Sequence, residues 1–178
     1  MLFILIVTII GVIFTAITLM GYVEEIDAVN SLNQILGLGI STGTLIFAII
    51  LIVLSLVANV IFVVFLVKRN PNCVLIFHIS IITYIIGLAI VLGFYGSLIE
   101  SLGSTLVSAS ESAELYSTQI IEIVRMIGFM ILWTIYFRKS VRMRTYMGSD
   151  EYLRKSPLTK GTVSPIPADG SFNTPPPM

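Results

Sequence analysis

The chain has very few of the residues that build metal, redox or disulfide sites, with one cysteine, Cys73, and one histidine, His78. A single cysteine cannot form an intrachain disulfide, and one cysteine with one histidine cannot supply the four ligands of a structural zinc site. The sequence also lacks a nucleophile–base pair, a phosphate-cradling glycine loop and suitably spaced paired carboxylates. It therefore predicts no catalytic residue, no metal site and no cofactor.

Charged residues are scarce as well, at 11% of the 178 residues against roughly 25% in an ordinary soluble domain. Lys plus Arg and Asp plus Glu number ten each, so the net charge of zero does not indicate a nucleic-acid partner. Hydrophobic residues make up 56%, more than one small water-soluble core can bury. This excess predicts a membrane protein, whose first partners are the membrane lipids.

Four segments are apolar and long enough to cross about 30 Å of hydrocarbon as helices, which takes about 20 residues each. Their unbroken apolar runs lack the alternation of barrel strands, so the predicted fold class is an all-α, integral membrane four-helix bundle. The first segment has no basic residue before it and no small-x-small site after it, which favours a retained helix over a cleaved signal peptide. The predicted spans are residues 2–20, 44–67, 73–95 and 119–137.

The basic residues outside the spans all fall on one side of the predicted membrane. Lys68 and Arg69 lie between spans two and three, and the other seven follow span four. The connections on the opposite side contain acidic residues but no Lys or Arg. By the positive-inside rule, both ends of the chain should be cytoplasmic, in a multi-pass protein of the cell membrane.

The connections on the opposite side, residues 21–43 and 96–118, are rich in Ser, Gly and Asn and are expected to be loops. Val23, Ile26 and Leu36 could form the apolar stripe of a short helix at the headgroups. By contrast, the Asn70–Pro71 step in the short connection between spans two and three predicts a tight helical hairpin.

After span four we expect a boundary at Gly148, a natural helix cap that separates a membrane domain, residues 1–148, from a cytoplasmic tail, residues 149–178. Ser149 to Glu151 has the pattern of a new helix start. Six of the seven prolines lie in residues 156–178, so the tail is predicted to be disordered beyond about residue 156.

Glu122 and Arg125 are the only charged residues within the predicted spans, three positions apart on one helical face. Charges at membrane depth cost about 2.5–3.5 kcal/mol and usually face a bundle interior or water. We favour a structural interhelical pair, with a transport or binding element as the alternative. Asn59, which shares a face of span two with Ser55, is a third intramembrane polar candidate.

Polar residues of span three have an ordinary explanation alongside a functional one. Ser80, Tyr84 and Gly87 share one helical face, which predicts helix packing. For His78 a hydrogen bond at headgroup level is favoured over a proton relay, and for Cys73 an interfacial thiol is favoured over palmitoylation.

The end of span four contains aromatic residues followed by a basic segment. Trp133 and Tyr136 are expected at the membrane interface, and Ser140 could cap a helix. Anionic headgroups should attract the basic side chains, which are Arg138, Lys139, Arg142 and Arg144.

This run, from Trp133 through Tyr136-Phe137 and Ser140 to Arg142 and Arg144, resembles the signature of domain-of-unknown-function family 2569. The resemblance covers about 15 residues together with the number and order of the helices. The Gly-Trp-Leu-like segment that precedes the first span in that family is absent from this chain. The resemblance implies a small prokaryotic membrane protein with about four helices, and it implies no activity.

Together these features predict a non-enzymatic accessory or interaction bundle that assembles with itself or with another membrane protein. The alternative is a small transporter or channel subunit in which Glu122 and Arg125 line a polar path, together with Asn59.

Overall fold

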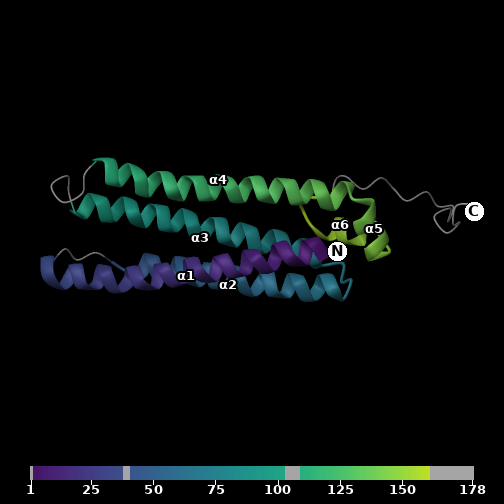
Figure 1. Cartoon of the computed structure of the whole chain (residues 1–178), viewed down its shortest axis with the longest axis horizontal. Helices are drawn as coiled ribbons and strands as arrows, with labels where there is room; N and C mark the ends of the chain where they lie inside the picture. The colour runs from purple at the N-terminus through teal and green to yellow at the C-terminus, as the bar shows by residue number, and fades with distance from the viewer. Residues whose placement is uncertain (1, 38–40, 103–108, 161–178) are drawn as a thin grey trace, which may run out of the picture.

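The computed structural model describes residues 2–37, 41–102 and 109–160, and these residues form helices without any strand. Four long helices run side by side (Figure 1): α1 (Leu2–Leu36), α2 (Gly43–Val67), α3 (Cys73–Leu102) and α4 (Ala109–Lys139). Two short helices follow, α5 (Val141–Met147) and α6 (Glu151–Lys155). The prediction of an all-helical protein with four long apolar helices is confirmed.

Each long helix contains a segment apolar and long enough to cross a membrane. Three of the helices extend well beyond the predicted spans, because α1 continues to Leu36, α3 continues to Leu102 and α4 begins at Ala109. Most of the two connections predicted as loops is therefore helical, and the short separate helix expected at the headgroups is instead the end of α1. The physical reason is that starting a helix is the costly step, so an established helix extends readily through polar residues.

Helices α2 and α3 form the centre of the bundle and make its most extensive contact. Their connection is the predicted tight hairpin, in which Arg69 has a φ of 54° and the Asn70 side chain accepts a hydrogen bond from the Asn72 backbone amide at 2.9 Å. Helix α1 packs mainly on α2, and α4 packs mainly on α3. Helices α1 and α4 thus flank the central pair.

The buried side chains form two clusters, one toward each end of the bundle. The cluster beside the first turn of α1 and the two short helices, here called the basic-end cluster, is rich in aromatic rings. In this cluster the Phe77 ring centroid lies 5.2 Å from the ring centroids of Phe62 and Phe137. It lies 6.1 Å from the ring centroid of Trp133. The far-end cluster joins Tyr22 and Val29 of α1 to α2 and α3.

The chain beyond α4 folds back onto the bundle, next to the N-terminal end of α1 (Figure 1). Ser140 has an extended backbone and caps α5 by accepting a hydrogen bond from the Met143 amide at 3.2 Å. Gly148, with a φ of 71°, ends α5 as expected. The predicted caps at both positions are present.

Burial does not stop at the expected domain boundary of residue 148. Tyr152, Leu153, Ser156 and Thr159 are all buried against the basic-end cluster or within the C-terminal turn. The packed unit therefore extends beyond residue 148 to Thr159, since Tyr152 and Leu153 are buried and Tyr152 and Ser156 form hydrogen bonds to the bundle. The remainder of the predicted disordered tail lies outside the described residues.

Candidate functional site

The Glu122–Arg125 ion pair is closed within one helix. Nη2 of Arg125 lies 2.7 Å from Oε1 and 2.5 Å from Oε2 of Glu122. The Arg125 side chain is 69% exposed and that of Glu122 is 25% exposed. The expectation of an interhelical pair is therefore wrong, since spacing of three residues on α4 lets the two groups meet without a second helix.

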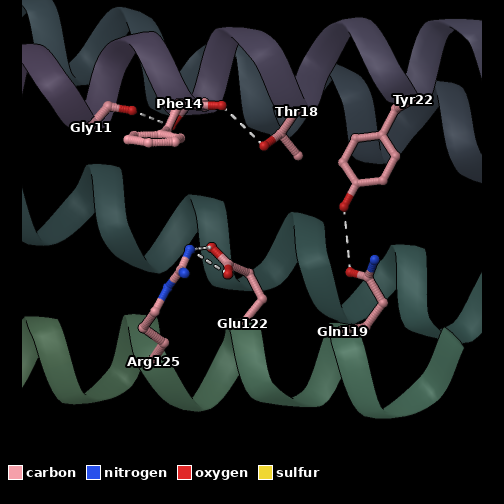
Figure 2. A network of polar contacts seen from close by, with 8 residues as sticks. Gly11, Phe14, Thr18, Tyr22, Gln119, Glu122 and Arg125 are labelled. Atoms are coloured by element: carbon pink, nitrogen blue, oxygen red, sulfur yellow. Dashed lines mark hydrogen bonds and ion pairs between the residues drawn. The ribbon is translucent and has the colours of Figure 1, made fainter. Parts of the chain in front are cut away.

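Other polar side chains of α1 and α4 lie near this pair (Figure 2). Thr18 and Tyr22 lie on the side of α1 toward α4, and Gln119 is one turn from Glu122 on α4. The Thr18 hydroxyl donates to the Phe14 carbonyl of its own helix at 3.0 Å. The Tyr22 hydroxyl donates a hydrogen bond to Oε1 of Gln119 at 3.4 Å, which joins α1 to α4.

The side of α1 that faces the bundle is loosely packed beside this pair. A Cβ atom added at Gly11 would meet nothing within 4 Å. Thr15 and Thr18, four and seven residues further on the same helical face, are only half-buried. We call this region the α1–α4 opening and define it by Gly11, Thr15 and Thr18 of α1 and by Glu122 and Arg125 of α4.

The α1–α4 opening is bounded at both ends. Toward the far end it is crossed by the Tyr22–Gln119 hydrogen bond. Toward the basic end, Ile4 of α1 is buried in the same apolar cluster as Trp133 of α4. From Arg125 to Phe137 the helix contains twelve residues, about 18 Å, and from Gln119 to Arg125 it contains six, about 9 Å. Along the full length of α4, from Ala109 to Lys139, the ion pair lies near the middle of the helix.

A second cross-helix tie lies close to the Tyr22–Gln119 bond. The Tyr95 hydroxyl of α3 is 2.8 Å from each carboxylate oxygen of Glu25 on α1. Sequence reasoning missed both ties. A usable signal was present, because Tyr22 and Tyr95 stand at the ends of the predicted first and third spans, where tyrosine commonly has a polar partner.

His78 makes two hydrogen bonds to protein side chains, which replaces the expected headgroup contact. The Thr134 hydroxyl donates its proton to the Met130 carbonyl at 2.7 Å, so it accepts from Nε2 of His78 at 2.8 Å. Nδ1 is then the acceptor for the Ser156 hydroxyl at 2.7 Å. His78 thus joins α3 to α4 and to the end of α6.

Ser80, on the face of α3 predicted to pack against another helix, bonds to Ser55 of α2. The Ser80 hydroxyl donates to the Ser55 carbonyl oxygen at 2.9 Å, and the two hydroxyl oxygens are 3.2 Å apart. Asn59, one turn further along α2, is half-buried. Because α2 packs mainly on α1 and α3, the structure does not bring Asn59 together with Glu122 and Arg125 in one contact network.

The residues predicted at the inner interface divide into buried and exposed groups. Trp133 is only 8% exposed and packs edge-to-face on half-buried Tyr136, with ring centroids 5.3 Å apart, so its ring faces the bundle interior. Cys73 is fully buried, which removes its thiol from the accessible surface. The basic side chains lie toward the outside, with Arg138 half-buried and the others exposed: Lys139, Arg142 and Arg144.

Comparisons of the chain with protein-family models, with curated proteins and with solved structures give no match. The resemblance to domain-of-unknown-function family 2569 stays a prediction. The four apolar helices are compatible with a multi-pass membrane protein.

Proposed function

We propose that this chain is a non-enzymatic multi-pass membrane protein that acts by interaction, holding another membrane component at the α1–α4 opening. The observation that carries this proposal is the packing of α1. The described residues of α1 from Ile6 to Gly21 are all at least partly exposed, whereas Ile4 before them and Tyr22 and Val29 after them are buried. The exposed side of this segment is therefore available to a partner.

The alternative, a transporter or channel subunit, is favoured by the exposure of Arg125, because charges at membrane depth often line a permeation path. A path through a single copy would also need polar groups toward the basic end. There the described side chains near the opening are mainly apolar and aromatic, among them Ile4, Phe129 and Trp133, and the Thr8 hydroxyl bonds to the Ile4 carbonyl of its own helix. The geometry therefore supports a one-ended site for binding better than a path.

Photocross-linking in native membranes tests the interaction function. We would place p-benzoyl-phenylalanine at Thr15, in the opening, and at Ile13, which is 53% exposed on the opposite face of α1. We expect one adduct of defined mass at position 15 and only heterogeneous labelling at position 13. The same pattern at both positions would contradict the proposal.

Flux measurements separate the two functions. The purified chain in sealed liposomes should conduct neither ions nor small solutes. A flux that is present in the wild type and abolished by Arg125→Gln, with Lys139→Gln unaffected, would establish the transport alternative instead.

A further inference from the structure

Arg125 is paired with Glu122 but its side chain stays 69% exposed, so a further polar group can reach the guanidinium. An arginine whose side chain is 69% exposed would face hydrocarbon if lipid tails alone filled the opening. The unfavourable free energy of a charge at that depth makes such a state improbable compared with one in which a polar group covers the guanidinium. The polar group has to enter from the side, between α1 and α4.

The charges of the site select the chemistry of that group. Arg125 and Glu122 neutralise each other, so a simple anion would bring a net negative charge into the membrane, and a simple cation a net positive one. A zwitterion keeps the net charge of the occupied site at zero. A phosphate matches the planar fork of the Arg125 guanidinium, and a primary ammonium can donate hydrogen bonds to the Glu122 carboxylate.

The direction of the side chains favours a group that comes from the far end of the bundle. Helical side chains lean toward the N-terminus of their helix, and α4 begins at the far end. In Figure 2 the Arg125 guanidinium accordingly reaches back toward Glu122 and Gln119. Gln119 and Tyr22 continue the polar side chains toward that end, about 9 Å from Arg125 along the helix.

We propose that the Glu122–Arg125 pair in the α1–α4 opening binds the headgroup of a phospholipid with a primary ammonium, of the phosphatidylethanolamine type. The phosphate lies on Arg125, the ammonium lies on Glu122, and the acyl chains stay in the leaflet at the far end of the bundle. This inference rests on the proposed function and names the class of component that the opening holds.

Native mass spectrometry of the full-length chain in a neutral detergent tests the proposal. The probes are phosphatidylethanolamine, phosphatidylcholine and phosphatidylglycerol with identical acyl chains. We expect phosphatidylethanolamine to bind about tenfold more tightly than phosphatidylcholine, since a quaternary ammonium cannot donate hydrogen bonds to Glu122. Equal binding of the three lipids would overturn the proposal, and so would a preference for phosphatidylglycerol.

Variants locate the site. Glu122→Gln and Arg125→Gln should each reduce phosphatidylethanolamine binding to the phosphatidylcholine level, whereas Glu114→Gln, at an exposed position on the same helix, should not. Arg125→Lys keeps the charge and should give an intermediate affinity. If either glutamine variant still preferred phosphatidylethanolamine over phosphatidylcholine as the wild type does, the headgroup would not be bound by Glu122 and Arg125. Should a variant fail to fold, the lipid selectivity of the wild type still decides.

The two proposals can fail separately. A defined protein adduct at position 15 without selectivity for phosphatidylethanolamine would refute the lipid headgroup and retain the interaction function. Absence of any defined adduct at position 15 together with a measured flux would refute the interaction function itself.

Discussion

His78 and Ser156 lie 78 residues apart in the sequence, yet Nδ1 of His78 and Oγ of Ser156 are 2.7 Å apart in a buried hydrogen bond. His78 belongs to a long apolar helix, and Ser156 ends the short helix α6. The bond therefore attaches the C-terminal segment to the bundle. A second bond does the same, because the buried Tyr152 hydroxyl donates to the Phe137 carbonyl oxygen at 3.0 Å.

Ser156→Ala should loosen the C-terminal segment. The change removes the donor to Nδ1 of His78 and leaves a buried acceptor unsatisfied, which lowers the free energy of unfolding by about 1–3 kcal/mol. Thermal unfolding in detergent measures the loss, and faster tryptic cleavage at exposed Arg154 and Lys155 reports the undocking. Ser149→Ala, at an exposed position, is the control, and equal effects of the two changes would contradict the prediction.

Docking of the C-terminal segment should also weaken at alkaline pH. Burial raises the pKa of Tyr152 from its ordinary value of 10.0 to about 12. The pKa of Tyr152 is higher in the folded chain than in the unfolded chain. The protonated Tyr152 side chain therefore contributes its full stabilisation below pH 10, and this contribution is lost as the pH rises toward 12. Tryptic cleavage after Arg154 should accelerate over this range.

Tyr152→Phe isolates this effect from the other tyrosines. The variant lacks the ionisable hydroxyl, so its cleavage rate should start higher at pH 8, because the hydrogen bond to Phe137 is missing, and should rise less between pH 10 and 12. The same pH dependence in the variant and the wild type would show that Tyr152 is not responsible.

The parts of the structure that the sequence predicts are those governed by local rules. Apolar runs of span length predict the four long helices, and the Asn70–Pro71 step predicts the hairpin between α2 and α3. The caps at Ser140 and Gly148 follow from the preferences of those residue types. Ser55 and Ser80 were predicted as packing residues from helical spacing alone, and they bond to each other.

The parts that sequence reasoning missed depend on contacts between distant residues. The burial of Trp133 and His78 depends on which face of α3 meets α4, and one sequence does not specify that choice. The exposure of Arg125 depends on how α1 and α4 flank the central pair of helices, which no local pattern encodes. The same holds for α6, whose five residues cannot form a stable helix by themselves and are helical because Tyr152 and Leu153 are buried.

Gly87 should be intolerant of a large side chain. A Cβ atom there would lie 3.0 Å from Cγ1 of Ile52 and 3.4 Å from the Ala48 carbonyl oxygen, at the contact of α3 with α2. Gly87→Leu should lower stability by about 1–3 kcal/mol through overpacking. Gly93→Leu on the same helix, where nothing lies within 4 Å of the added Cβ, should be tolerated. Thermal unfolding of the two variants measures the difference. Equal stability of the two variants would contradict the close contact between Gly87 and α2.

The orientation in the membrane is the last prediction, and it follows from the distribution of basic residues. Every Lys and Arg except Arg125 lies near the basic end of the bundle or beyond it, so this end should be cytoplasmic. A cysteine introduced at Ser110, at the start of α4, should then react with a membrane-impermeant maleimide added to intact cells. A cysteine at Lys160, which is exposed near the end of the docked segment, should react only after the membrane is permeabilised. The native Cys73 is fully buried, so the unmodified chain should give a low background of labelling and serves as the control. Labelling at position 160 but not at position 110 in intact cells would reverse the orientation, and it would place the proposed lipid headgroup in the cytoplasmic leaflet.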